Sequence, residues 1–171
     1  MCHQDKIAVF DLDGTLWKGN SHYEILNAYF KTSFYTSFLF RLASHFFRKQ
    51  MYKFICRKYE EIPKAFSLSF ELEFNTAVLS VLEQKKKETY FCLILSNAPL
   101  EIIMHASQKL GLPYLKAPIG RKKEFLDKNY TYKTLFVCTD NIEDIDLIEA
   151  SDSRNIIYTN NNKRFFARKG F

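Results

Sequence analysis

Polar residues follow three apolar runs of this sequence, at points where buried strands would end. They are Asp11 and Asp13 after the first run, Ser96 and Asn97 after the second, and Asp140 and Asp144 after the third. In a parallel sheet the carboxyl ends of the strands meet at one edge, and ligands bind there. Carboxylates gathered at one edge repel one another unless a cation joins them, and oxygen ligands favour Mg²⁺ over Zn²⁺. We therefore predict a Mg²⁺ site that, together with the Ser96 loop, holds an anion such as a phosphoryl group.

The elements that would position these residues alternate along the chain. Buried strands are expected at residues 6–11, 90–95, 134–138 and 155–158. Helices are expected at residues 74–82, from Pro99 to Gly111, from about Arg121, at residues 142–150 and in the basic tail. Strands that alternate with helices indicate a parallel sheet covered on both faces. We predict an α/β fold with a Rossmann-like three-layer α/β/α core and a helical insertion after the first strand.

Four motifs of the sequence resemble, in order, those of the haloacid dehalogenase superfamily. They are DLDGTL at 11–16, LILSNAP around Ser96, the lysines after Gly120, and TDNIEDIDLIEAS at 139–151. The resemblance covers nearly the whole chain, and the C-terminal segment is similar to that of the phosphoserine-phosphatase-like branch. DxDGT after an apolar strand is a specific signal, and the order of the other three motifs strengthens it.

The resemblance implies a role for each matching residue. Asp11 would be the nucleophile that becomes an aspartyl phosphate, and Asp13 the general acid and base. The phosphoryl oxygens would be bound by Ser96, Asn97 and a lysine, for which Lys122 is preferred over Lys123. The Mg²⁺ ligands would be Asp11, the Asp13 backbone carbonyl, Asp140 and Asp144, the last directly or through water.

Two positions bear on which reaction the resemblance implies. Asp13 favours a phosphatase, because the dehalogenases and phosphonate-cleaving relatives lack an aspartate there. Phosphomutases share it, so a phosphomutase stays open as an alternative, as does a catalytically weak module that binds phosphate or a membrane. Thr139 stands where the superfamily usually has Gly before the metal-binding aspartate, so we expect an altered metal site.

The spacing of the motifs places an insertion between the first two. From Asp11 to Ser96 is 85 positions, whereas from Ser96 to Lys122 is only 26. We expect a catalytic core formed by residues 1–16 and 73–171 and a helical cap formed by residues 17–72. Such a cap would exclude water and favour a small or slender substrate.

The cap segment also carries the unusual composition of the chain. Residues 17–60 contain eight Lys or Arg against two Asp or Glu, a surplus equal to the net charge of +6 of the whole protein, and 13 of the 28 aromatics. One interpretation makes these aromatics the small core of the cap, with the charges on its solvated face. The other is that the cap recognises an anionic or flat apolar leaving group, or rests on an acidic membrane surface.

The remaining features of the sequence limit where the protein is expected to be located and what it is expected to bind. The 171 residues suit one domain with an insertion, and the four widely spaced cysteines without a C-x-x-C pair favour a reducing, cytoplasmic location. No signal peptide or membrane-spanning segment is expected. We expect a small phosphorylated metabolite or a lipid-linked phosphate as the substrate, and no nucleic acid as a partner. Peripheral membrane contact through the cap stays open, as does the oligomeric state.

Overall fold

The computed structural model describes residues 2–71 and 73–171, with the side chains of Arg41, His45, Arg48 and Lys49 outside the description. The chain divides into two compact units. The core unit comprises Met1–Lys18 and Glu73–Phe171, and the inserted unit comprises Gly19–Leu72.

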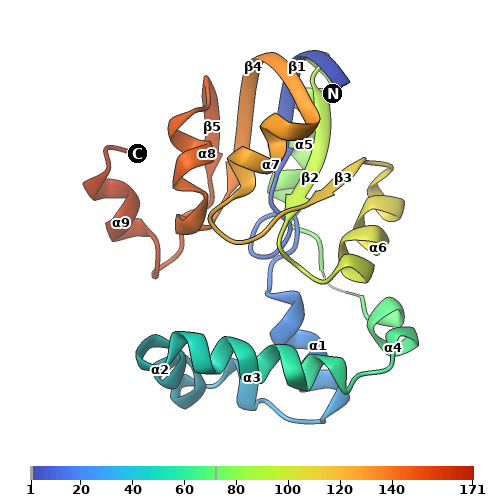
Figure 1. Ribbon diagram of the computed structural model, residues 1–171, viewed down its shortest axis with the longest axis vertical. Helices are drawn as coiled ribbons and strands as arrows, with labels where there is room; N and C mark the ends of the chain where they lie inside the picture. Colours follow the sequence, from blue (N-terminus) through green and yellow to red (C-terminus); the bar gives the residue numbers. More distant parts are fainter. Residues whose placement is uncertain (1, 72) are drawn as a thin grey trace. The chain divides into compact units, whose positions relative to one another are not determined.

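The core unit is built on a parallel sheet of five strands (Figure 1). They are β1 (Cys2–Phe10), β2 (Phe91–Ser96), β3 (Tyr114–Lys116), β4 (Tyr130–Thr139) and β5 (Ser153–Ile156), in the spatial order β3-β2-β1-β4-β5. Phe10 of β1 is level with Ile94 of β2 and with Cys138 of β4. The segments that follow these three strands therefore leave the sheet at the same edge. This architecture confirms the predicted α/β class with its Rossmann-like parallel sheet.

Side chains alternate between the two faces of the sheet along each strand, and other side chains pack against both faces. One face forms an apolar cluster in which Ile7, Val9 and Val137 pack with residues from the helices α7 (Lys122–Asn129), α8 (Ile145–Glu149) and α9 (Lys163–Arg168). On the other face Phe10 contacts Phe136, and Lys85 of helix α5 (Thr76–Lys87) lies over the Phe136 ring. The strands are buried on both sides, which explains why they are apolar runs instead of alternating patterns.

The core helices are α5 (Thr76–Lys87), α6 (Leu100–Leu110), α7 (Lys122–Asn129), the 3₁₀ turn η2 (Ile142–Asp144), α8 (Ile145–Glu149) and α9 (Lys163–Arg168). Gly111 ends α6 in the left-handed conformation, with φ of 61°, as its place after Leu110 predicts.

The inserted unit is helical and has a small core of its own. Its elements are α1 (Ser21–Tyr29), the 3₁₀ turn η1 (Phe34–Thr36), α2 (Phe38–Phe46), α3 (Arg48–Glu60) and α4 (Lys64–Ser69). The buried apolar side chains are Ile25, Leu26, Tyr35, Phe40, Ile55, Tyr59 and Ile62. The Asn27 side chain joins α1 to η1, because it donates to Thr36 Oγ1 (2.9 Å) and accepts from the Tyr35 N–H (3.0 Å).

Several details differ from the sequence-based expectations. The strands β1 and β4 each begin four residues before the expected ranges. The edge strand β3 was not expected, since its three residues give no readable periodicity. The last strand begins at Ser153 and ends at Ile156, two residues before the expected range. Trp17 and Lys18 belong to the core unit and not to the insertion, because Trp17 bridges to Phe74 and the Lys18 N–H donates to the Glu73 carbonyl.

Among the described residues, no helix combines the length and the apolar character that crossing a membrane requires.

Candidate active site

Asp11 is the first residue after β1, and its carboxylate is buried at the edge where the strands end. The backbone N–H of Leu12 donates to Asp11 Oδ1 (2.8 Å), and Lys122 Nζ lies 2.8 Å from the same oxygen. The Asp11 N–H donates to the Cys138 carbonyl (2.9 Å), which continues the pairing of β1 with β4. The sheet and two donors therefore hold this carboxylate in one orientation.

Lys122 joins two carboxylates in the interior. It opens α7, its side chain is 1% exposed, and its ammonium contacts Asp11 Oδ1 at 2.8 Å and Asp144 Oδ2 at 2.7 Å. Burial lowers the pKa of Lys122, but the Asp11 and Asp144 carboxylates outweigh that effect, so the pKa is raised and the group is a cation. Its neighbour Lys123 pairs instead with the exposed carboxylate of Asp127. The structure thus places Lys122, the preferred of the two lysines, beside Asp11.

Asp144 lies in η2 and is fixed by two donors on one oxygen. Lys122 Nζ and the Thr139 hydroxyl, which donates at 2.7 Å, both contact Oδ2. The Thr139 hydroxyl also accepts from the Asn141 N–H (3.0 Å), so the side chain that replaces the usual Gly braces the turn. Burial raises the pKa of Asp144, and Lys122 opposes that shift. Asp144 Oδ1 is buried and has no hydrogen-bond partner among the described residues.

Asp140 lies directly after β4 and faces the turn that follows β1. Its N–H donates to Thr15 Oγ1 (3.0 Å), and the Thr15 hydroxyl donates back to Asp140 Oδ1 (3.2 Å). A Cβ at Gly14, where φ is 72°, would lie 2.2 Å from Asp140 Oδ2. Burial and the nearby Asp11 carboxylate raise the pKa of Asp140 to about 7. Glycine at position 14 is therefore required both by its backbone conformation and by the carboxylate against it.

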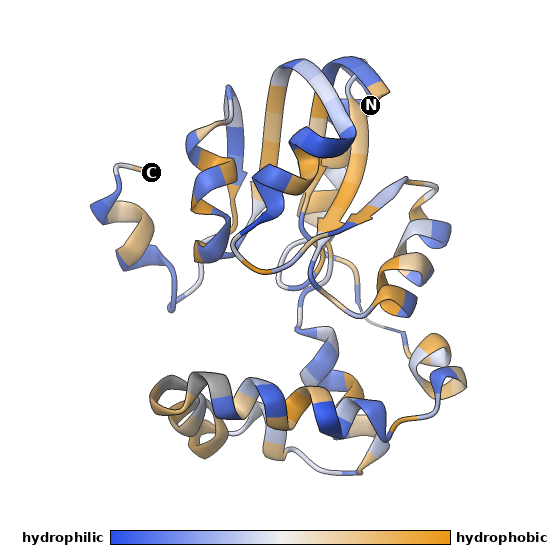
Figure 2. Ribbon diagram, in the orientation of Figure 1, coloured by the Kyte–Doolittle hydropathy of each residue, from blue (hydrophilic) through white to orange (hydrophobic). Residues whose placement is uncertain are grey.

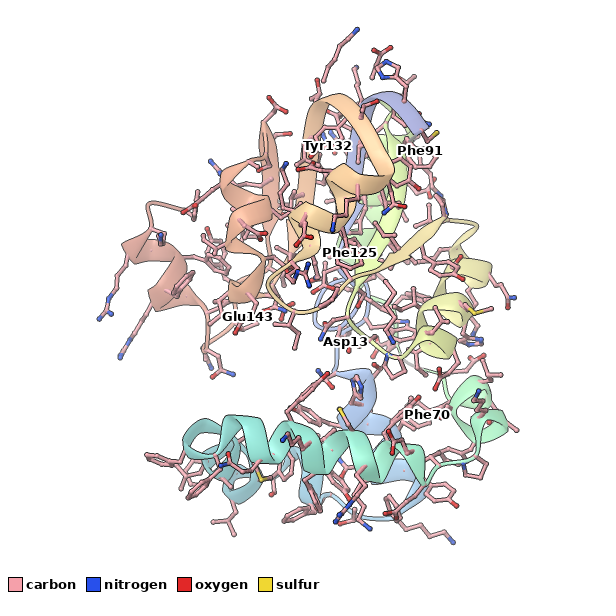
Figure 3. The ribbon with its side chains drawn as sticks, in the orientation of Figure 1. Asp13, Phe70, Phe91, Phe125, Tyr132 and Glu143 are labelled. Carbon is pink, nitrogen blue, oxygen red and sulfur yellow. The ribbon has the colours of Figure 1, made fainter. Side chains whose placement is uncertain are left out.

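The other predicted site residues lie at the same end of the sheet. Asp13 follows the β1 strand end, and Figure 3 shows it with Glu143 at the end of the sheet opposite to Phe91. Ser96 is the last residue of β2 and is buried; its Oγ accepts from the Ala98 N–H (3.2 Å). Asn97 is half-buried in the turn that follows.

One residue of this region was not expected from the sequence. Asn162 is buried between β5 and α9, and its amide donates to the carbonyls of Asp140 (2.6 Å) and Ile157 (2.9 Å). It also accepts from the Thr159 N–H (2.7 Å), so the C-terminal segment is tied to the backbone of Asp140. Its place in a run of three asparagines gives no spacing signal that separates it from its exposed neighbours.

The predicted Mg²⁺ ligands can be tested against this geometry. No three His, Cys, Asp or Glu side chains of the described chain are grouped in the way a metal site would require. With Asp144 acting through water, the predicted set needs only two carboxylates at the cation, those of Asp11 and Asp140, and the Asp13 backbone carbonyl would complete it. Two observations fit a cation: Asp140 and Asp11 are close enough to raise the pKa of Asp140, and Asp144 Oδ1 is buried without a hydrogen-bond partner among the described residues. The residues present therefore fit Mg²⁺.

Comparisons with known proteins identify the fold. No protein-family model matches the sequence, and no curated protein matches it. Solved structures do match. A protein of unknown function from Bordetella pertussis Tohama I is 12% identical with a TM-score of 0.63, and the match covers 98% of this chain and 97% of that chain. A HAD-family hydrolase from Salmonella enterica serovar Typhi is 15% identical with a TM-score of 0.64, covering 85% of this chain and 60% of that one.

A third solved structure is described as a phospho-aspartyl intermediate analogue of phosphoserine phosphatase. It is 15% identical with a TM-score of 0.57, and the match covers 88% of this chain and 85% of that chain. The chain has the haloacid dehalogenase fold. This confirms the fold that the four motifs imply. Three of these motifs lie where β1, β2 and β4 end, at one edge of the sheet, and the lysine motif opens α7.

Proposed function

We propose that this protein is a Mg²⁺-dependent phosphatase of the haloacid dehalogenase superfamily that hydrolyses a small phosphate monoester through a phosphorylated Asp11. The observation that carries the proposal is the buried contact of Lys122 with Asp11 at the end of β1, with Asp13 two residues further on. A carboxylate held still by a cation and a backbone N–H is pre-organised for attack.

In the first step Asp11 attacks phosphorus. Lys122 and the Leu12 N–H both bind Oδ1, so we assign the attack to Oδ2. The bond from Oδ2 to phosphorus forms as the bond from phosphorus to the leaving oxygen breaks, and the carboxylic acid of Asp13 donates its proton to that oxygen. The product alcohol leaves, and Asp11 carries the phosphoryl group.

In the second step water replaces Asp11. The Asp13 carboxylate takes a proton from the water, whose oxygen bonds to phosphorus while the bond to Asp11 Oδ2 breaks. Phosphate leaves, and both aspartates return to their starting states. One difficult displacement is thereby divided into two easier ones.

Three groups would hold the phosphoryl oxygens during both steps. The Ser96 hydroxyl accepts from the Ala98 N–H, so its own O–H is available to donate to a phosphoryl oxygen. A backbone N–H at Asn97 would add a second donor, and the Lys122 ammonium would neutralise charge shared between Asp11 and the phosphoryl group. These donors are directed at charge that spreads over the phosphoryl oxygens in the transition state.

The cation would be held by the Asp11 and Asp140 carboxylates and the Asp13 carbonyl, with Asp144 as a direct or water-mediated ligand. When bound, Mg²⁺ supplies charge that offsets the repulsion between the phosphoryl group and the carboxylates. Hydrogen bonds from Thr15 and Asn162 would hold Asp140 in position for this role, and Gly14 leaves the space that its carboxylate occupies.

Two further points support a phosphatase. A similar solved structure is that of a phospho-aspartyl analogue of phosphoserine phosphatase, which carries its intermediate on the corresponding type of residue. Asp13 supplies the acid that an alkoxide leaving group needs, a residue the dehalogenase branch lacks. The inserted unit leaves the core five residues after Asp13, and we assign it the role of a lid that favours small substrates.

The test compares Asp11→Asn with Asp127→Asn, a matched change of an exposed carboxylate on α7. With p-nitrophenyl phosphate and Mg²⁺, we expect Asp11→Asn to lower kcat at least about 10³-fold, because the nucleophile is lost, and Asp127→Asn to leave it unchanged. EDTA is expected to abolish wild-type activity and added Mg²⁺ to restore it. Circular dichroism checks that both variants fold.

Retained activity in folded Asp11→Asn would overturn the proposed nucleophile. A wild-type protein without Mg²⁺-dependent turnover of any phosphate monoester would instead leave the fold without the activity assigned to it.

A further inference from the structure

Helix α2 of the inserted unit exposes a stripe of large apolar side chains. Phe38 is 75% exposed, Leu39 72%, Leu42 45% and Phe46 70%. Phe38, Leu42 and Phe46 are spaced by four residues, so they lie on one side of the helix, with Leu39 beside them. Figure 2 shows that α2 is coloured as largely hydrophobic where it is not grey. The interpretation that the aromatics form the core of the cap is therefore wrong for Phe38 and Phe46, although it holds for Phe40 of the same helix.

The opposite side of α2 already supplies the packing that the inserted unit needs. Phe40 is 1% exposed and contacts the rings of Tyr23, Phe34 and Tyr35. One buried residue and one stripe of exposed ones on the same short helix show that the stripe does not serve the unit's own core. Exposed apolar side chains gathered in this way are typical of a docking surface.

The exposed apolar side chains continue beyond α2. Phe47, the residue between α2 and α3, is 58% exposed, and Tyr52 of α3 is 50% exposed. Because α2 packs against α3, we call this set of exposed side chains the α2–α3 surface. Its apolar members are Phe38, Leu39, Leu42, Phe46, Phe47 and Tyr52.

The segment that forms this surface has charged residues of one sign over most of its length. Residues 25–59 contain seven Lys or Arg and no Asp or Glu. Of these, Lys53 and Arg57 are one helical turn apart on α3 and both are exposed. The segment that carries the α2–α3 surface thus combines exposed apolar side chains with basic and no acidic residues between positions 25 and 59.

We propose that the α2–α3 surface docks on an anionic membrane surface. Phe38, Leu39, Leu42 and Phe46 would enter the boundary between headgroups and acyl chains, and Lys53 and Arg57 would contact lipid phosphates. Charge decides between this occupant and a second copy of the chain, because two surfaces with the same net positive charge repel each other. A helix of nine residues is about 14 Å long, which is too short to cross a hydrocarbon core of about 30 Å. With its apolar stripe along one side, α2 would lie along the membrane plane.

Vesicle binding tests the proposal on the full chain without substrate, so the result does not depend on the proposed phosphatase activity. We expect the wild-type protein to sediment with vesicles of phosphatidylcholine and phosphatidylglycerol at moderate salt. Binding to phosphatidylcholine alone is expected to be at least about tenfold weaker, since the choline cation balances the phosphate and this lipid carries no net charge. Raised salt should weaken binding to the anionic vesicles.

Two pairs of variants separate the apolar and the charged contributions. The apolar pair compares Leu42→Ser/Phe46→Ser with Leu100→Ser/Met104→Ser, two exposed apolar residues at the same spacing on α6. The charged pair compares Lys53→Gln/Arg57→Gln with Arg164→Gln/Arg168→Gln, which are exposed on α9. We expect the two α2–α3 variants to bind anionic vesicles at least about tenfold more weakly and both controls to bind as the wild type does.

Three results would overturn the proposal. They are a wild-type protein that does not bind anionic vesicles, α2–α3 variants that bind as well as their controls, and a wild-type dimer in sedimentation velocity that Leu42→Ser/Phe46→Ser converts to a monomer. The last would assign the surface to a second copy of this chain.

Discussion

The core unit and the inserted unit distribute charged and apolar side chains in opposite ways. In the core unit Asp11, Lys122 and Asp144 are buried in contact with one another, and the apolar strands are covered on both faces. In the inserted unit the Lys53 and Arg57 side chains are exposed, as are four large apolar residues of α2. Burying a charge is costly unless an opposite charge pairs with it, as Lys122 does with its two carboxylates. Large apolar side chains exposed together are typical of an interaction site. The comparison supports the proposals that the chemistry belongs to the core unit and that the inserted unit recognises a surface.

The largest expected difference between the units comes from changing one lysine in each. Lys122→Met leaves two carboxylates buried without their cation, so we expect the free energy of unfolding to fall by about 3–5 kcal/mol. Lys53→Met on the exposed face of α3 should change it by less than about 0.5 kcal/mol. Urea denaturation measures both. Equal effects of the two substitutions would break the comparison, because the buried ion pairs would then not stabilise the core.

Substituting two glycines of the core unit tests whether the packing around Asp140 matters for the proposed metal site. Gly14 and Gly120 both have positive φ, but only Gly14 lies against another side chain, the Asp140 carboxylate. Gly120→Ala should cost about 1 kcal/mol from backbone conformation alone, and Gly14→Ala about 2 kcal/mol more from the clash. The activation of hydrolysis by Mg²⁺ should weaken only in Gly14→Ala. A Gly14→Ala protein as stable as Gly120→Ala would contradict the observed packing.

The acidic cluster predicts how stability depends on pH in EDTA. The pKa of Asp140 is about 7 in the folded protein and 3.8 ordinarily, so the folded state holds this proton more tightly than the unfolded chain. The free energy of unfolding should therefore fall as pH rises from about 4 to about 7, by at most about 1.4 kcal/mol per pH unit from this group. Asp140→Asn should flatten the slope. An unchanged slope in that variant would show that Asp140 does not titrate in this range.

Asn162 is expected to give the smallest of these effects. Asn162→Ala leaves the carbonyls of Asp140 and Ile157 without this buried donor, which should cost about 1–2 kcal/mol and weaken activation by Mg²⁺. The matched control is Asn161→Ala, whose side chain is exposed and should be neutral. Thermal unfolding and Mg²⁺ titration of activity measure both, and equal behaviour of the two variants would remove Asn162 from the site.

The parts of the structure that could be predicted from the sequence are those set by strand ends. The apolar strands and the parallel sheet follow from residue pattern, and the sheet brings the residues after β1, β2 and β4 to one edge. The spacing of the lysine motif favours Lys122 over Lys123, and the structure places Lys122 beside Asp11.

The remaining features depend on tertiary packing that a single sequence does not encode locally. Nothing in the spacing of Asn162 indicates that it reaches Asp140. The regular spacing of Phe38, Leu42 and Phe46 predicts one face of a helix, but it does not say whether that face is buried. Its exposure follows from Phe40, which takes the inward position instead.

A covalent intermediate tests the central claim most directly. In Asp13→Asn the base of the second step is lost, while p-nitrophenyl phosphate still phosphorylates Asp11 because its leaving group is weakly basic. After acid quenching, mass spectrometry of the intact protein and its peptides should show one phosphoryl group on Asp11 in this variant, and none in Asp11→Asn/Asp13→Asn. A phosphoryl group on another residue, or none on Asp11 while substrate is consumed, would contradict the account.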